Sequence, residues 1–401
     1  MILAAAVLAN VAQWLAIAHE IVPQSNNIRP MHLLLVIAIL IGMTSIYLAL
    51  RPRTIYLVDY ACFRPNTNFR FPKATSVEHA RLSPLLDDST ANFIASIHER
   101  SGMGDQTYFP PVVMHMEPYC GLDEARTEAE LVVFSVIDDL LAKTCINLDA
   151  VGVLITNCSL FCPVPSISDM IVNRYKLRGD LRVMNLSGMA CSASVTAVGL
   201  TSNILRFMPW GSYALVVSTE TIGPCYYVGN KRSMQLSNLL FRMGGVAKLL
   251  STSRSKARFR LGHFTRTITA ASNTAYRCVY QEEDEKGNLG IALSKDLMAV
   301  AGDALAANIT STAPLVLPAS ELFKFWLFCM AKKSTSSVWY ELAYIEAKGR
   351  MKKGNKVWMI GFGAGYECNT VGWMCIQPSS GADGPWASCI HRYPVDLSNK
   401  V

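Results

Sequence analysis

A strand–helix–strand unit between residues 181 and 218 is the feature that most constrains the fold. Residues 181–186 and 212–218 are short apolar runs, each of the length of a buried strand. Residues 192–207 between them have the composition of a helix. Two buried strands separated by one helix predict a parallel β–α–β layout, with helices covering both faces of the sheet. The chain is therefore expected to adopt an α/β fold.

Cys191 lies where this helix begins, in the small-residue turn SGMACSAS at residues 187–194. The first turn of a helix offers free backbone N–H groups and the positive end of the helix dipole. Both favour the thiolate, so the position predicts a lowered pKa and a nucleophilic sulfur. A buried, inert cysteine is the alternative interpretation.

A second candidate site is the glycine-rich segment GFGAG at residues 361–365, followed by Asn369. Residues 356–360 are expected to form a strand that opens onto a glycine loop. The segment lacks the lysine of a phosphate-binding loop and the spacing of a dinucleotide-binding one. We therefore interpret its glycines as letting the backbone approach a substrate closely. For Asn369 alone, local hydrogen bonding in a turn is the alternative.

The N-terminus resembles a membrane anchor. Residues 1–18 and 31–50 are apolar, and the second run contains no Asp, Glu, Lys or Arg. Spanning a bilayer takes about 20 such residues. We expect a two-span anchor within residues 1–52, with core helices or a cleaved signal peptide as alternatives. Arg51 and Arg53 flank the second run, which places the body of the protein in the cytosol.

Composition argues against other classes of function. The net charge is +7 over 401 residues, but the basic residues are scattered. Nucleic-acid binding would need a basic stripe with interleaved aromatic residues, so we expect no nucleic-acid partner. The charge suits an anionic membrane surface or CoA phosphates. The 12 cysteines lack disulfide-framework or zinc spacing, so we expect reduced thiols, no metal and no cofactor.

Together, the motifs resemble those of the plant 3-ketoacyl-CoA synthases, the condensing enzymes of very-long-chain fatty acid elongation, within the thiolase-like superfamily. The resemblance covers about residues 55–317 and 336–401. Matching stretches lie at residues 56–62, 157–161, 175–179, 185–192, 216–220, 239–245, 279–284, 293–302, 339–350, 363–373 and 384–395.

The resemblance implies a chemistry. Cys191 would take the acyl group from a long-chain acyl-CoA, and malonyl-CoA would lose CO₂ to give the enolate that attacks the acyl-cysteine. Asn369 would donate a hydrogen bond to the enolate oxygen. The backbone N–H of Cys191, together with Gly363 or Gly365, would form the oxyanion hole. No cofactor beyond the substrates is implied.

The resemblance also implies a five-layer α/β/α/β/α fold made of two similar halves behind the anchor. The N-terminal half would span residues 53–250 and the C-terminal half residues 251–401. A homodimer, contacts with other elongase subunits and a place in the endoplasmic reticulum membrane are further expectations.

The chain departs from the family pattern in one important respect. The family has a catalytic histidine in a His-Ala-Gly-Gly segment, but here residues 322–333 run directly into 334–337, which is the mark of an internal deletion near 333–334. None of the seven histidines is a good replacement. Loss of an enolate donor typically costs about 10²–10³ in rate. Ala190 and Ser194 also replace two family glycines, and a positive φ at position 190 would strain alanine.

Two other functions remain open at this point. One is a non-catalytic, membrane-anchored homologue that binds acyl-CoA or active elongase subunits, which the missing histidine favours. The other is a soluble relative of the type III polyketide synthases, which share Cys-His-Asn chemistry. The apolar N-terminus argues against the second of these.

Overall fold

The computed structural model describes residues 30–50, 53–101, 104–316, 338–379 and 384–393. The chain divides into two compact units, Met1–Pro52 and Arg53–Val401. In the first, helix α2 spans Pro30–Leu50. Among the residues described, no helix meets the length and apolarity required to cross a membrane. The predicted two-span anchor therefore stays a prediction, and its first run, residues 1–18, lies outside the described residues.

The second unit contains a mixed sheet of eight strands in the order β3-β2-β4-β5-β1-β6-β10-β9, and a separate hairpin, β7–β8. The strands are β1 Tyr56–Cys62, β2 Val151–Asn157, β3 Arg182–Leu186, β4 Tyr213–Thr219, β5 Gly245–Ser251, β6 Phe259–Ile268, β7 Val279–Glu283, β8 Leu289–Leu293, β9 Lys356–Gly363 and β10 Glu367–Cys375. The helices are α3 Lys73–Leu82, α4 Asp88–Arg100, α5 Leu122–Thr144, α6 Ile167–Tyr175, α7 Ala193–Leu205, α8 Arg232–Leu240, α9 Asn273–Tyr276, α10 Leu297–Val316 and α12 Val338–Ala347.

The predicted parallel unit is confirmed, but its first strand, β3, is an edge strand with four of its five residues exposed and not a buried one. Strands β3 and β4 both pair in parallel with β2, which lies between them, and α7 connects β3 to β4. Because the carboxyl ends of parallel strands meet at one edge of the sheet, the loops after β2, β3 and β4 lie close together. Cys191 follows β3 at this edge, so the topology brings residues from three loops to the nucleophile.

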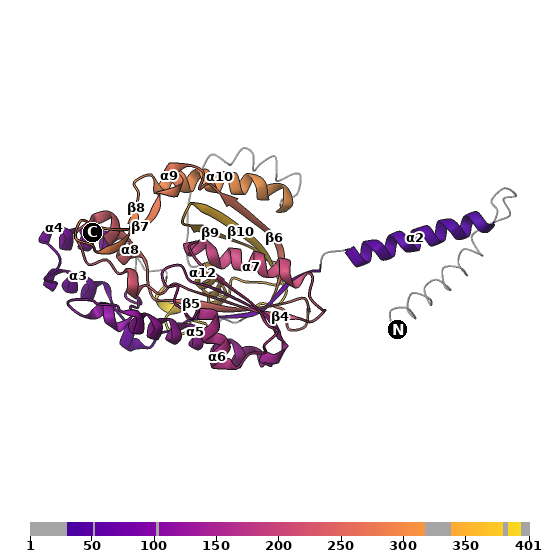
Figure 1. The fold of residues 1–401 in the computed structure, drawn as a ribbon, viewed down its shortest axis with the longest axis horizontal. Helices are drawn as coiled ribbons and strands as arrows, with labels where there is room; N and C mark the ends of the chain where they lie inside the picture. The colour runs from indigo at the N-terminus through magenta and orange to yellow at the C-terminus, as the bar shows by residue number, and fades with distance from the viewer. Residues whose placement is uncertain (1–29, 51–52, 102–103, 317–337, 380–383, 394–401) are drawn as a thin grey trace. The chain divides into compact units, whose positions relative to one another are not determined.

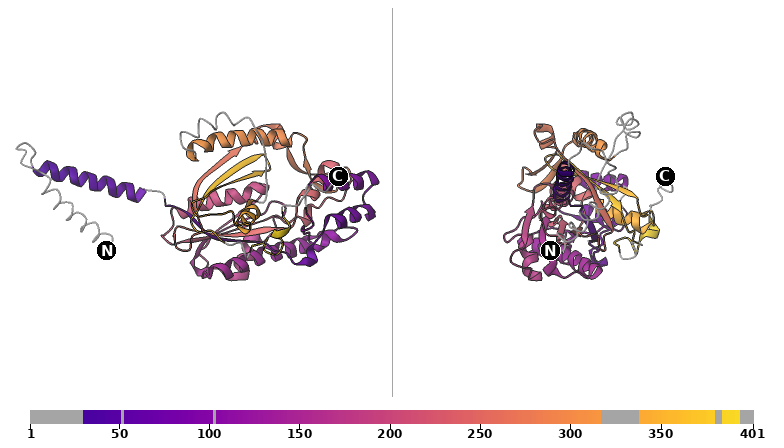
Figure 2. Two further views of the ribbon diagram at one scale, coloured as in Figure 1. Left: turned by 180° about the vertical axis from the view of Figure 1, so that it is seen from behind. Right: turned by 90° about the vertical axis from the view of Figure 1, so that its right-hand side faces the viewer.

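Helices and strands are stacked in layers (Figures 1 and 2). Helix α5 packs on β1, β4 and β5, and α7 contacts β2 and β4 on one side and β9 and β10 on the other. Helix α10 packs on β6 and β10. The order α5, strands, α7, strands, α10 agrees with the predicted five layers, and it places the start of α7 in the middle of the molecule.

The expectation of two similar halves, residues 53–250 and 251–401, stays a prediction. The described strands that follow residue 251 in this sheet, β6, β10 and β9, pair in antiparallel fashion. The sequence between α10 and α12, where a crossover would be expected, lies outside the described residues. The two groups of strands meet where β1 pairs with β6 at Tyr56–Arg260 and Leu57–Phe259.

A buried charge network ties these two groups together. Arg258, at the start of β6, forms ion pairs with Asp59 of β1 and with Glu346 of α12. The hydroxyl of Tyr60 donates to the second oxygen of Glu346 at 2.6 Å. Each buried charge thus has an opposite charge and a hydrogen bond, which is the condition under which ionic groups are tolerated in a core.

One local expectation needs correction. Gly361 and Gly363 do not lie in a loop but belong to β9, and only residues 364–366 make the turn into β10. The backbone of 361–363 pairs with a neighbouring strand, and local composition does not report such pairing.

Candidate active site

The Cys191 turn has an unusual backbone. Between β3 and α7 the chain passes through a short 3₁₀ helix at Ala190–Ser192, and both Gly188 and Ala190 have positive φ, 75° and 47°. Glycine tolerates this conformation, whereas for alanine the steric strain costs about 1 kcal/mol or more. The strain anticipated at Ala190 is therefore present. A hydrogen bond from the Ala190 N–H to Ser159 Oγ, 2.8 Å long, helps to hold the turn.

Strand β9 packs directly against this turn because it carries glycines. A Cβ atom at Gly363 would lie 2.2 Å from both Met189 O and Ser192 Oγ. One at Gly361 would lie 3.5 Å from Cys191 O. The glycines therefore allow close approach, as predicted, but to the nucleophile turn. Gly365 is in the hairpin turn at φ +87°, and a Cβ there would meet only Ala270.

Asn369 is fully buried on β10 and contacts the same helix as Cys191. Its Nδ2 donates to Thr196 Oγ1 of α7 at 2.8 Å and to Glu367 Oε2 at 3.1 Å. Its Oδ1 is buried with no partner among the described residues. Asn369 thus retains one unused hydrogen-bonding position beside α7.

A charged network that the sequence did not reveal connects Asn369 to the nucleophile turn. Glu367 Oε1 pairs with Arg266 of β6 at 2.6 Å. Its Oε2 accepts from Asn369 and from Ser192 Oγ, the latter at 3.3 Å. Glu367 and Asn369 alternate on one strand and so share a face. That spacing is visible in the sequence, but the pairing with Arg266 depends on the register between β6 and β10.

A second carboxylate lies on the other side of the turn. Glu220 directly follows β4, and its Oε2 accepts the backbone N–H groups of Ser159 and Leu160 at 2.9 and 3.0 Å. Burial raises the pKa of Glu220. Both segments belong to stretches that match the family, but nothing in their local sequence indicates that they meet beside Cys191.

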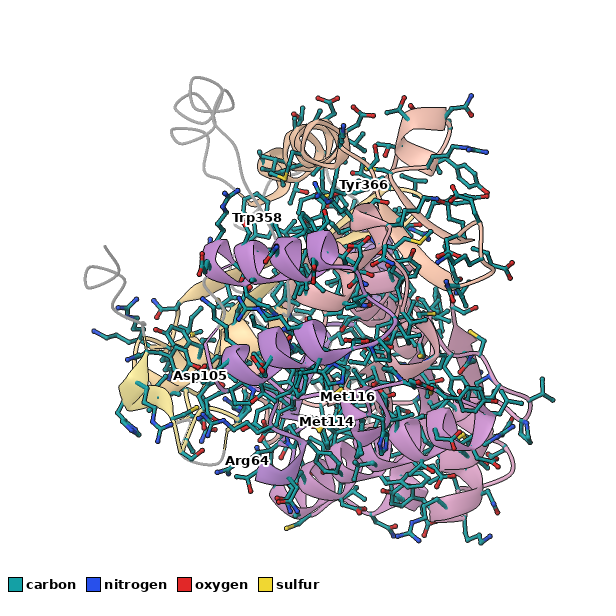
Figure 3. The ribbon with its side chains drawn as sticks, turned by 90° about the vertical axis from the view of Figure 1, so that its left-hand side faces the viewer. Arg64, Asp105, Met114, Met116, Trp358 and Tyr366 are labelled. Carbon is teal, nitrogen blue, oxygen red and sulfur yellow. The ribbon has the colours of Figure 1, made fainter. Side chains whose placement is uncertain are left out.

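The electrostatics of Cys191 contradict the expectation of an activated thiol. Burial and, to a smaller extent, the Glu220 carboxylate raise the pKa of Cys191 to about 11. Cys191 is accessible to solvent, but the surrounding protein reduces the hydration of its sulfur enough to disfavour the thiolate. Cys191 precedes α7 within the 3₁₀ turn, and this desolvation outweighs the helix dipole. Tyr366, labelled in Figure 3, is near enough for Cys191 to raise its pKa, although burial is the main cause.

No histidine among the described residues contacts this cluster. His98 is buried between α3 and α4, where it bonds to Ser76 and where burial lowers its pKa to about 4. His79 bonds to the carbonyl of His115. His263 is exposed on β6. Within the described part of the chain, no group of three metal-ligating side chains is placed to hold a metal ion.

The clearest cavity in the described structure lies elsewhere. Residues of α3, α4, α8 and nearby loops line it, among them His79, Phe109, Tyr226, Gln235 and Leu239. None of its lining residues belongs to the Cys191 cluster. The geometry of the thiol, the amide and the glycines therefore identifies the candidate site better than the cavity does.

Comparison with known proteins shows the family of this chain. The family described as FAE1/Type III polyketide synthase-like protein matches residues 47–334. The chain is 43% identical to 3-ketoacyl-CoA synthase 4 of Arabidopsis thaliana, over 90% of this chain and 82% of that protein. It is 42% identical to 3-ketoacyl-CoA synthase 6 of the same plant, over 90% and 85%.

Among solved structures, the chain is similar to 1,3,6,8-tetrahydroxynaphthalene synthase of Streptomyces coelicolor, a bacterial type III polyketide synthase. The TM-score is 0.66 at 15% identity, covering 80% of this chain and 99% of the other. A likeness at this identity concerns the fold alone. Sequence and fold together show that the chain belongs to the FAE1/type III polyketide synthase-like family, as a homologue of the plant 3-ketoacyl-CoA synthases.

Proposed function

We propose that this protein is a 3-ketoacyl-CoA synthase that condenses a long-chain acyl-CoA with malonyl-CoA in very-long-chain fatty acid elongation. Cys191 loses its proton and attacks the thioester carbonyl, and CoA leaves as the thiol with that proton. Malonyl-CoA loses CO₂, and the carbon of its enolate attacks the acyl group. The bond to Cys191 then breaks, the Cys191 thiolate takes a proton from solvent, and 3-ketoacyl-CoA departs.

The observation that carries this proposal is the contact between β9–β10 and the Cys191 turn. Gly361 and Gly363 allow that contact, and Ser192, Glu367 and Asn369 are hydrogen bonded across it. Asn369 is the proposed donor to the enolate oxygen. The Cys191 N–H, with Gly363 or Gly365, is the proposed oxyanion hole.

The test is a condensation assay in microsomes that contain the full chain. Labelled malonyl-CoA and a long-chain acyl-CoA are supplied to the wild type, to Cys191→Ala and to Asn369→Ala. We expect labelled 3-ketoacyl product from the wild type only. Product from Cys191→Ala equal to the wild type would exclude Cys191 as the acyl carrier.

A second function, a non-catalytic homologue that binds acyl-CoA or active elongase subunits, is favoured by one observation. Among the described residues no histidine reaches Cys191 or Asn369, and the sequence lacks the His-Ala-Gly-Gly segment. The same assay separates the two functions. A wild type that becomes acylated at Cys191 without giving product has only the loading step, and one that is not acylated fits the binding role.

We further propose that residues 1–52 anchor the protein in the endoplasmic reticulum membrane with its body in the cytosol. The support is the sequence of residues 31–50, which has the length of a span and no Asp, Glu, Lys or Arg, and the basic residues Arg51 and Arg53 that follow it. Resistance to alkaline extraction from microsomes, with the body open to added protease, is the expected result. Release by alkali would contradict it.

A homodimer is proposed through β3. This strand is at the edge of the sheet, four of its five residues are exposed, and Val183 and Met184 are among them. An uncovered apolar edge strand invites pairing with a second chain. Light scattering in detergent should give twice the mass of one chain, and Val183→Lys should reduce it to one. Association with other elongase subunits would be tested by co-purification.

A further inference from the structure

Glu220 is linked to the nucleophile turn through a single residue. Its Oε2 accepts the N–H groups of Ser159 and Leu160, and Ser159 Oγ in turn accepts the N–H of Ala190 at 2.8 Å. Ala190 directly precedes Cys191 and has a strained, positive φ. The carboxylate thus fixes the loop whose hydroxyl holds the turn.

The other carboxylate oxygen of Glu220, Oε1, does not take part in these hydrogen bonds. Oε1 is buried and has no hydrogen-bond partner among the described residues. Three thiols lie near this carboxylate. Cys158, directly after β2, donates from Sγ to Oε2 at 3.8 Å, and the carboxylate raises the pKa of Cys225 and of Cys191. None of the cationic side chains in the described residues forms an ion pair with it. A buried carboxylate without a counter-charge acts on its neighbours mainly by repelling negative charge.

We propose that Glu220 is a positioning residue for Cys191, which holds the nucleophile turn through Ser159 and whose charge keeps the thiol protonated in the substrate-free enzyme. The charge of Glu220 adds to the rise that burial causes in the pKa of Cys191. Because burial also raises the pKa of Glu220 itself, this charge acts on the thiol once the pH is high enough to ionise the carboxylate. Two acids so placed titrate as a coupled pair. The inference rests on the proposed role of Cys191, but its test reads the thiol itself and needs no turnover.

The experiment measures the rate of Cys191 alkylation by iodoacetamide as a function of pH, with the full chain in detergent micelles. Because the chain has 12 cysteines, modification is read by mass spectrometry on the tryptic peptide of residues 183–206, in which Cys191 is the only cysteine. Glu220→Gln keeps the shape and removes the charge. It should move the pH midpoint of alkylation down by about one unit.

Glu128→Gln is the matched control. Glu128 is also a buried carboxylate that accepts two backbone N–H groups, from Ile222 and Gly223, but it is not among the groups that shift Cys191. It should leave the midpoint unchanged. Ser159→Ala should change the rate at high pH, where the thiolate is already formed, and move the midpoint less than Glu220→Gln.

An unmoved midpoint in Glu220→Gln, or an equal shift in Glu128→Gln, would overturn the proposal. If Glu220→Gln does not fold, Glu220→Asp takes its place. The shorter side chain retains the charge but holds it farther from Cys191. The midpoint should then fall by a smaller amount, and no change would overturn the proposal equally. A shifted midpoint in a chain that gives no condensation product would count only against the proposed function.

Discussion

The Cys191 segment, residues 189–196, has charged side chains beside two of its faces. Those beside one face are ion-paired, and those beside the other are not. Toward β6, β9 and β10, the paired face, Glu367 is ion-paired to Arg266 and both of its oxygens are engaged. Toward β2, β4 and β5, the unpaired face, Glu220 and Lys248 are buried without an opposite charge among the described residues. Lys248 Nζ donates only to hydroxyls, those of Ser194 at 2.8 Å and Ser218 at 2.5 Å.

This difference separates two tasks. The paired face is held by an ion pair and by hydrogen bonds to both oxygens of Glu367, so it fixes where Asn369 and the turn lie. On the unpaired face burial lowers the pKa of Lys248 and raises the pKa of Glu220, so the charge of that face depends on pH. We therefore expect substitutions on the paired face to reduce stability at every pH, and those on the unpaired face to change how the protein responds to pH.

Lys248→Met should produce the largest change. Burial lowers the pKa of Lys248 to about 7 from its usual 10.5. Below pH 7 the folded and unfolded states are both protonated, so the full cost of the buried charge is present. Between about pH 7 and 10 only the unfolded state keeps the proton, so wild-type stability rises with pH.

The substitution should therefore add about 1–4 kcal/mol to the free energy of unfolding at pH 6, and this gain should fade toward pH 10. Denaturant unfolding of the full chain in micelles, followed by tryptophan fluorescence, measures it. Ser194→Gly removes one acceptor of the same amine and is the companion variant. A gain independent of pH would show that Lys248 keeps its proton in the folded state over this range, as it does in the unfolded state.

Gly363→Ala tests the packing of the paired face. The new Cβ would lie 2.2 Å from Met189 O, a backbone atom that cannot move alone. Overpacking of this kind costs about 1–3 kcal/mol, and we expect that loss at pH 6 and at pH 9 alike. Gly179→Ala, where an added Cβ meets nothing within 4 Å, is the control. Equal stability of the two variants would mean that β9 and the turn are not in contact.

Glu367→Gln tests the ion pair of the same face. The amide retains an acceptor for Ser192 or Asn369 but leaves Arg266 without its partner. Hydrogen bonds to charged groups contribute about 1.5–3 kcal/mol, and the partial exposure of Arg266 places the expected loss near 1.5. Glu282→Gln, which breaks the more exposed pair with Lys231, should cost less than about 1 kcal/mol. Equal losses of stability in the two variants would mean that the Glu367–Arg266 pair contributes no more than an ion pair at the surface.

The sequence predicts one face of this site far better than the other. The strand–turn–helix at Cys191 follows from apolar runs and small residues, and the glycines and Asn369 follow from a family motif. Lys248 lies on β5, and the pattern of the sequence does not show that all seven residues of this strand are buried. Contacts between the loops after parallel strands, such as Glu220 with Ser159, arise only once the strand order is known.

Ala190→Gly should give the smallest effect and joins the two faces. Glycine relieves the left-handed strain at φ 47° but adds entropy to the unfolded chain, so the net gain should be near 0.5–1 kcal/mol. In the wild type, the hydrogen bond from Ala190 N–H to Ser159 Oγ helps to keep the turn in this strained conformation. Glu220, on the unpaired face, fixes the position of Ser159. Ser159→Ala removes this hydrogen bond, so it should change the gain in free energy of unfolding that Ala190→Gly gives. The effects of substitutions at residues in contact are not additive. A double-mutant cycle on the free energy of unfolding measures this coupling. Strict additivity would mean that Ser159 does not hold the turn, and the link from Glu220 to Cys191 would then be electrostatic alone.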